Sequence, residues 1–338
     1  MDVLHLFGST QSAFYYDLSK MYAGAVLRPA GTRHRFAGVS PDGLWRFGPS
    51  VEDLGAPMPL MAALAQIGQP DLVVPHMFCR AGMTSYRALI EDVLNLPLVG
   101  APAPVAGLAT SKLWTRDVIA SAGARVADAE RLEDGAVPSL AVPYVVKPDK
   151  EDNSLGISVV RAPEEAAAAV AHARRYDDSI FAEAFIPGRE LRAAVVEVDG
   201  ALQVPAFIEY PVSEARPIRE VADKLEQGDG DAAMRQSTRA DAQPICPADV
   251  DPALASALTQ AAKIAHKALS ARHYSLFDFR VHSETGTPYI LEAGLFWSFS
   301  GLSAITKMIT GAGQDATEIT GKIWADAAEL PAKTRVAA

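Results

Sequence analysis

Two carboxylates, Asp278 and Glu292, each stand inside an otherwise apolar stretch late in the chain, and this feature constrains the fold most. The stretches 275–282 and 289–292 have the pattern of β-strands, with apolar residues on both sides of each carboxylate. A Glu-Thr-Gly turn at 284–286 joins the two stretches. We therefore expect two neighbouring strands that bring both carboxylates to corresponding positions.

Carboxylates in apolar strands are costly unless each has a partner. Two hard oxygen donors that face each other predict a magnesium site, which phosphates and waters would complete. A salt bridge to Arg272 or Arg280 is the alternative. We favour the metal site.

The first hundred residues alternate apolar strands with amphipathic segments. We expect strands at 3–7 and 72–74 and helices at 58–67 and 84–94. This βα alternation predicts a parallel, doubly wound sheet in an N-terminal α/β domain over residues 1–107.

The rest of the chain predicts two α+β subdomains, 108–188 and 189–332. The further expected elements are helices at 111–122, 163–176 and 252–271 with two more at the C-terminus, and strands at 144–147, 157–160, 179–184 and 190–198. Residues 211–245 are charged and lack clean periodicity, which predicts a lid over the site. The stretch 93–111 is long enough to span a membrane, but its prolines and glycines predict a soluble linker.

Charge and cysteine content narrow the function classes. The formal net charge is −10 and no run of Lys and Arg offsets it locally, which argues against nucleic acid as a partner but not against a nucleotide. Cys79 and Cys246 are far apart and lack zinc-site spacing. With no signal-peptide pattern at the start, we expect a cytoplasmic protein with no membrane contact.

Two further segments suit nucleotide binding. Lys147 ends an apolar strand ahead of a polar loop that reaches Gly156, and such a lysine can hold phosphates while loop N–H groups cover them. Glu183 and Glu190 flank a short link whose backbone could meet an adenine. Taken singly, an ordinary strand-end lysine and solvated glutamates are the preferred interpretations.

In their order along the chain, these parts resemble the ATP-grasp ligases, specifically the D-alanine:D-alanine ligase branch. The resemblance covers nearly the whole chain and rests on Ser111-Lys112, Val146-Lys147-Pro148 with Gly156, Glu183 to Glu190, Arg272 six residues before Asp278, and Leu291-Glu292. It implies a three-part fold with the nucleotide between the two α+β subdomains. It also implies an ADP-forming C–N ligase that uses ATP with one or two Mg²⁺ ions, or Mn²⁺.

The resemblance implies a role for each matching residue. Phosphates would be contacted by Lys112 and Lys147 and covered by Asn153, Ser154 and Gly156. Adenine would be bound by Glu183, Phe185 and Ile186, ribose by Glu190, and magnesium by Asp278 and Glu292. The catalytic set would be Arg272, which neutralises charge during phosphoryl transfer, Lys224, which closes over the γ-phosphate, and His76.

The sequence departs from this family in its substrate region. The stretch 8–14 lacks the carboxylate that holds the first substrate's ammonium group, Asn153 replaces a loop serine, and Gly294 replaces the asparagine ligand of a second metal. The segment 295–300 is more aromatic than the family's Pro-Gly turn, which suits a flatter substrate or simply core packing.

These departures, with segments 222–225, 272–280 and 291–295, resemble the ligases that attach an amino acid to mycosporine-glycine. That resemblance implies phosphorylation of a ring oxygen and its displacement by an amine to give an imine. The alternatives are a D-alanine:D-alanine or other dipeptide ligase, and an inactive ATP-binding regulatory protein. The expected partners are a small acid and an amino acid, and a homodimer is left open.

Overall fold

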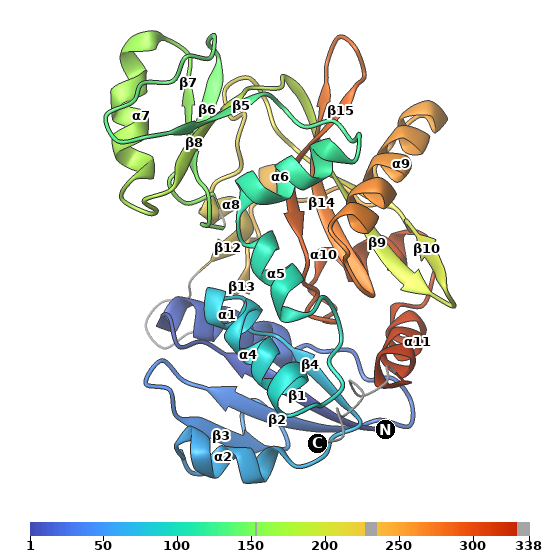
Figure 1. Ribbon diagram of the computed structural model, residues 1–338. Helices are drawn as coiled ribbons and strands as arrows, with labels where there is room; N and C mark the ends of the chain where they lie inside the picture. Colours follow the sequence, from blue (N-terminus) through green and yellow to red (C-terminus); the bar gives the residue numbers. More distant parts are fainter. Residues whose placement is uncertain (153, 227–234, 330–338) are drawn as a thin grey trace.

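The computed structural model describes residues 1–152, 154–226 and 235–329, and Asn153 therefore lies outside the described residues. The described part forms two four-stranded sheets, one five-stranded sheet and one two-stranded sheet. In Figure 1 the N-terminal sheet lies at the bottom, the small sheet of β5–β8 at the upper left and the five-stranded sheet at the right. No helix in the described ranges is both long and apolar enough to cross a membrane.

The N-terminal sheet has the order β3-β2-β1-β4. β1 pairs in parallel with β2 and β4, as the alternation predicts, whereas β3 is antiparallel to β2. Its strands and the helices around it are β1 (Asp2–Gly8), β2 (Arg33–Val39), β3 (Trp45–Gly48), β4 (Leu72–Pro75), α1 (Ala13–Gly24), α2 (Leu60–Ile67), α3 (Arg80–Met83) and α4 (Ser85–Ala88). The predicted helix 84–94 is divided, because after α4 the chain forms a π-helical turn, η1 (Leu89–Val93).

Alternate residues of β1 enter two different cores, as the two-residue period of a strand requires. Leu4 and Leu6 pack against α2 and η1, whereas Val3 and Phe7 pack against the C-terminal part of the chain. At the end of β1, Gly8 has φ +109°, and an added Cβ would meet the Val39 carbonyl oxygen at 2.1 Å. Only glycine fits this close approach between β1 and β2.

A small antiparallel sheet of order β5-β8-β6-β7 follows. One face is covered by α7, whose alanines pack against Val146, Val160 and Ile180. The elements are α5 (Ala103–Ala109), α6 (Lys112–Ser121), β5 (Ala129–Leu132), β6 (Tyr144–Pro148), β7 (Ser158–Val160), the 3-10 turn η2 (Pro163–Glu165), α7 (Ala166–Ala173) and β8 (Ile180–Ala184). The predicted linker 93–111 thus contains a short helix, α5. Pro102 is its N-cap and Pro104 lies in its first turn, where no N–H is needed for the helix.

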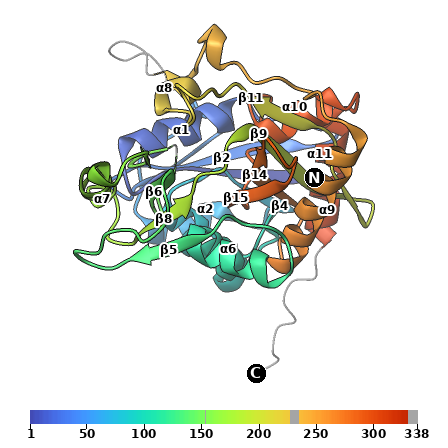
Figure 2. The ribbon, with the colours of Figure 1, turned by 90° about the horizontal axis from the view of Figure 1, so that it is seen from above.

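The five-stranded sheet is built on its longest strand, β9, which pairs with β10, β11 and β14, while β14 also pairs with β15. Its elements and the C-terminal helices are β9 (Gly188–Val198), β10 (Ala201–Gln203), β11 (Phe207–Tyr210), α9 (Pro252–Ala268), β14 (Tyr274–His282), β15 (Pro288–Gly294), α10 (Ala304–Gly311) and α11 (Ala316–Glu329). Seen from above, β6 and β8 lie on the left and β14 and β15 lie to the right of them (Figure 2). The domain boundaries that we predict between residues 107 and 108 and between residues 188 and 189 stay predictions.

The predicted lid segment contains short elements on both sides of residues 227–234, which lie outside the described residues. They are α8 (Val221–Lys224), β12 (Leu225–Glu226), β13 (Arg235–Gln236) and the 3-10 turn η3 (Ala240–Ala242). β12 and β13 pair with each other, so the described part of the segment contains regular structure.

A line of three histidines connects the N-terminal sheet to α11. His5 Nδ1 lies 2.9 Å from His76 Nε2, and His5 Nε2 lies 2.8 Å from His34 Nδ1. The Thr32 hydroxyl donates to a carbonyl and therefore accepts from His34 Nε2, which makes every ring in the line a neutral Nε2–H tautomer. Trp324 of α11 contacts the rings of His5 and His34.

Because these histidines are buried and neutral, we expect acid to destabilise the fold. Burial lowers the pKa of His5, and it lowers the pKa of His76 to about 3. Because the folded pKa values lie below the unfolded value of about 6.5, the stability is fully present above pH 6.5 and is lost as the pH falls. At pH 5 the buried, neutral His76 should lower the free energy of unfolding by about 2 kcal/mol relative to pH 7.5.

Urea unfolding at pH 7.5 and pH 5.0 measures this loss. His76→Asn should shrink the difference between the two pH values by about 2 kcal/mol, whereas His282→Gln, outside the line, should leave it unchanged. An equal loss in wild type and His76→Asn would contradict the assignment.

Candidate active site

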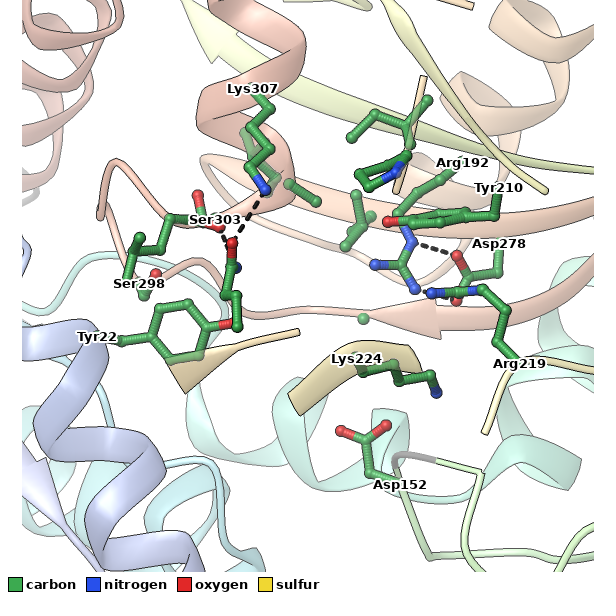
Figure 3. A pocket seen from close by; sticks show the side chains of 18 of the residues that line it. Tyr22, Asp152, Arg192, Tyr210, Arg219, Lys224, Asp278, Ser298, Ser303 and Lys307 are labelled. Carbon is green, nitrogen blue, oxygen red and sulfur yellow. Dashed lines mark hydrogen bonds and ion pairs between the residues drawn. The ribbon is translucent and has the colours of Figure 1, made fainter. Parts of the chain in front are cut away.

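A cavity of about 280 Å³ lies where the N-terminal part, the small sheet and the five-stranded sheet meet. Its charged residues gather at one end around Asp278, and a second group of polar residues lies around Lys307 (Figure 3). The lining includes Tyr22 and Phe78 from the N-terminal part, Asp152 from the loop after β6, Arg192, Tyr210, Asp278, Glu292 and Gly294 from the large sheet, Arg219, Lys224 and Gln236 from the lid segment, and Phe296, Ser298, Ser303 and Lys307 beyond β15.

Asp278 and Glu292 are direct partners in the β14–β15 register, as predicted. Asp278 also faces Arg192 of β9, which donates to it from both Nε and Nη2, the latter at 2.7 Å (Figure 3). Burial alone would raise the pKa of the Asp278 carboxyl, but the Arg192 charge and hydrogen bonds lower it. The carboxylate therefore stays ionised, and its partner is neither Arg272 nor Arg280.

Glu292 pairs with Lys112 at 3.1 Å. Lys112 is the first residue of α6, and its ammonium also donates to the Glu151 carbonyl in the loop after β6. Burial opposes the charge of this lysine, yet the Glu292 carboxylate raises its pKa. A predicted phosphate ligand and a predicted metal ligand thus hold each other in place.

Within the described ranges, no group of three or more His, Cys, Asp or Glu side chains is arranged to hold a metal ion. The pair Asp278 and Glu292 nevertheless supplies the hard oxygen donors that Mg²⁺ prefers, at the wall of a cavity that also contains Asp152. The donor set therefore fits a magnesium ion whose other ligands come from phosphates and water.

Lys147 of β6 and Glu183 of β8 form a buried ion pair. Their Nζ and Oε2 atoms are 2.6 Å apart, and the two side chains are 8% and 5% exposed. Arg116 of α6 lies 3.8 Å from the other carboxylate oxygen of Glu183. The two residues predicted to contact phosphate and adenine therefore meet on neighbouring strands.

The loop after β6 meets the lid segment. Ser154 has φ +65° and Gly156 has φ +73°, and a Cβ on Gly156 would meet Pro148 and Tyr176 at under 3 Å. Lys224 of α8 donates to the Ser154 hydroxyl at 2.9 Å. Burial lowers the pKa of Lys224, because desolvation disfavours its charged form.

The link between β8 and β9 carries the residues predicted for adenine and ribose. Arg280 lies over the Phe185 ring, 5.5 Å from its centroid, and Ile186 is half-buried beside it. Glu190 accepts from Arg219 at 2.6 Å, and the Arg219 guanidinium lies 3.5 Å from the Tyr210 ring centroid. An arginine of the lid segment therefore holds the Glu190 carboxylate in place.

Two predicted catalytic residues do not line the cavity. Arg272 pairs with Glu91 at 2.7 Å and donates to the carbonyls of Gly100 and Leu98, so its guanidinium is fully occupied beside the N-terminal part. His76 is fully buried in the histidine line. Their predicted roles have no support from the geometry.

Arg192 and Arg219 line the cavity but were missed from the sequence. The sequence did contain a signal for Arg192. Glu190 and Arg192 both interrupt the apolar strand β9, and because they are two residues apart they lie on the same face of it. Arg219 had no such signal, because it lies in the charged lid segment.

The aromatic segment after β15 has two environments. Trp297 borders the cavity, but it is 1% exposed and donates to Ser303 and Thr306, so most of its ring packs in the core. Phe296 lines the cavity with its ring centroid 4.2 Å from that of Phe78. Of these two residues, Phe296 is the less buried and suits contact with a flat substrate better.

The chain is similar to known D-alanine–D-alanine ligases. The family described as D-ala D-ala ligase C-terminus matches residues 118–324. The D-alanine–D-alanine ligase of Citrifermentans bemidjiense is 30% identical over 265 residues, which cover 77% of this chain and 79% of that relative.

Solved structures agree in fold. The VanG D-Ala:D-Ser ligase of Enterococcus faecalis has a TM-score of 0.78 at 19% identity and covers 96% of this chain and 99% of its own. The D-alanine–D-alanine ligase of Coxiella burnetii has a TM-score of 0.74 at 20% identity, with 97% and 94% covered. The predicted ATP-grasp fold and the predicted class of ATP-dependent, ADP-forming C–N ligase are confirmed. This chain belongs to the D-alanine–D-alanine ligase family.

Proposed function

We propose that the protein joins two amino acids, phosphorylating the carboxylate of one with ATP so that the amine of the other can displace the phosphate. The observation that carries this proposal is the gathering of Lys224, Asp278 and Glu292 around one cavity. Lys112 is paired with Glu292, and the buried pair Lys147–Glu183 lies on the neighbouring small sheet. Relatives named D-alanine–D-alanine ligase support the same reaction class.

In this proposal ATP lies between the sheet of β5–β8 and the five-stranded sheet. Lys112 and Lys147 exchange their carboxylate partners for phosphate oxygens, and Lys224 brings the lid segment onto the γ-phosphate. Glu183 then accepts from the adenine amine and Glu190 from the ribose. Both lysines keep an anionic partner throughout, which avoids the cost of isolating a buried charge, and Glu183 keeps a hydrogen-bond donor.

Asp278 and Glu292 would hold one magnesium ion, which neutralises phosphate charge when bound. Gly294 offers no side chain as a ligand for a second ion, so we propose a single protein-held site. Arg192 lines the cavity beside Asp278, and we assign to it the charge-neutralising role predicted for Arg272.

A second candidate is the ligation of an amino acid to mycosporine-glycine. It is favoured by the stretch 8–14, which reaches the start of α1 without a carboxylate for a substrate ammonium group, and by Phe296 at the cavity wall. A ring substrate needs no ammonium partner, and an aromatic wall suits a flat ring.

Release of ADP and phosphate by the purified protein, followed by product mass, separates these candidates. Turnover with amino acids alone supports dipeptide ligation. Turnover that requires both mycosporine-glycine and an amino acid supports the second candidate. ATP binding with no substrate-dependent ADP from either set would contradict both candidates.

A further inference from the structure

Lys307 lies in the first half of α10 and lines the second polar end of the cavity. Its ammonium donates to the Gln236 side-chain oxygen at 3.0 Å, and Gln236 in turn donates to the Leu302 carbonyl at 2.6 Å (Figure 3). Among the residues that the structure describes, no carboxylate forms an ion pair with this ammonium. Burial lowers the pKa of Lys307, consistent with a charge that lacks an anionic partner.

Local energetics disfavour a lysine at this position. A cation near the N-terminus of a helix opposes the helix dipole, and a half-buried ammonium without a counter-ion loses solvation. By contrast, Arg192 and Arg219 in the same cavity are paired with Asp278 and Glu190. Among the described residues, the charge of Lys307 therefore has no anionic partner.

A second observation at this end points to a ligand. Ser298 is 1% exposed and lines the cavity, yet its hydroxyl has no hydrogen-bond partner in the described structure. Buried hydroxyls are nearly always paired, so an unpaired one in a cavity wall indicates a group that arrives with a substrate. Tyr22 also lies here, and burial raises the pKa of its phenol, which remains a neutral donor.

The first turn of α10 adds a further anion-attracting feature. The Ser303 hydroxyl caps the Thr306 N–H, while Ala304 and Ile305 line the cavity. Their backbone N–H groups belong to the first turn, where a helix has no internal acceptors. This end therefore offers two separate attractions for negative charge, the ammonium of Lys307 and the start of α10.

Resting on the proposed amino-acid ligation, we propose that Lys307, Gln236, Tyr22 and Ser298 form a subsite for a second carboxylate, so that one substrate is an acidic amino acid. The start of α10 takes one carboxylate and Lys307 takes the other. Neutral amino acids leave Lys307 without a counter-ion and bind more weakly.

Isosteric pairs test this subsite, because glutamate and glutamine, or aspartate and asparagine, differ in charge but hardly in shape. Calorimetric titration in the presence of Mg²⁺ and a non-hydrolysable ATP analogue should show at least tenfold tighter binding of one acid, as either enantiomer, than of its amide. ADP release should follow the same preference. Lys307→Gln should remove the preference, and Lys307→Arg should keep it.

Lys322→Gln serves as the matched control, since Lys322 is an exposed lysine of α11 outside the cavity, and it should leave the preference intact. Thermal unfolding of each variant separates lost binding from lost folding. Equal binding of acid and amide by wild type, or a preference that survives in Lys307→Gln, would overturn the subsite. Acid-selective binding without any ADP release would instead reject the ligase proposal and leave the subsite standing.

Discussion

Lys147→Met is expected to abolish ATP binding and to lower the stability of the fold. The change leaves the Glu183 carboxylate buried without its partner at 2.6 Å, which should cost about 3–5 kcal/mol in the free energy of unfolding. Because the same ammonium is proposed to contact phosphate, calorimetric titration with ATP and Mg²⁺ should show at least a hundredfold loss of affinity.

A double variant separates the two effects. Lys147→Met with Glu183→Leu removes both buried charges, so it should regain most of the stability while ATP binding stays lost. Lys150→Met, at an exposed position three residues further on, should behave as wild type. Recovery of ATP binding in the double variant would contradict the assignment of Lys147.

Arg192→Met is expected to lower kcat about 10²- to 10³-fold, the usual loss when one preorganised charge at the reacting centre is removed. Its guanidinium holds Asp278 through two bonds and lines the cavity where phosphoryl transfer is proposed. Arg192→Lys keeps the charge but loses the fork geometry, so it should recover only part of the rate.

Arg189 provides the matched control for Arg192. It lies on the same strand and makes a similar two-bond pair with Glu209, but it does not line the cavity. Arg189→Met should therefore leave kcat within about twofold of the wild-type value, because a partly exposed ion pair contributes little. If Arg192→Met kept normal kcat while Arg272→Met lost it, the role predicted for Arg272 from sequence would be restored.

The elements predicted from the sequence are those whose own residues carry a clear period. β1, β4, β6 and β8 are short apolar runs, and α9 is a long amphipathic helix with Asp251 as its cap. β2 was missed because it begins Arg33-His34-Arg35, which has no apolar alternation. Its basic residues are instead held by Asp2 and by the histidine line.

The residues of the candidate site also fall into those that the sequence predicted and those that it did not. Lys112, Lys147, Glu183, Asp278 and Glu292 were found from order and spacing, and the structure brings them into two ion pairs and one strand register. Arg192 was missed although it interrupts the apolar pattern of β9, because that pattern does not show which strand lies beside β14. The role predicted for Arg272 stays a prediction. Its guanidinium contacts Glu91 rather than the cavity, because sequence distance from Asp278 does not determine the direction of a side chain.

The central claim is that ATP phosphorylates one substrate and an amine then displaces the phosphate. The most direct test labels the carboxylate of each of the two substrates with ¹⁸O in turn, in a mixture with ATP and Mg²⁺ that supports ADP release. We expect one labelled oxygen in the inorganic phosphate for each ADP and each C–N product when the phosphorylated substrate carries the label, and none when its partner carries it. ADP formation with no label in the phosphate from either substrate would contradict the central claim.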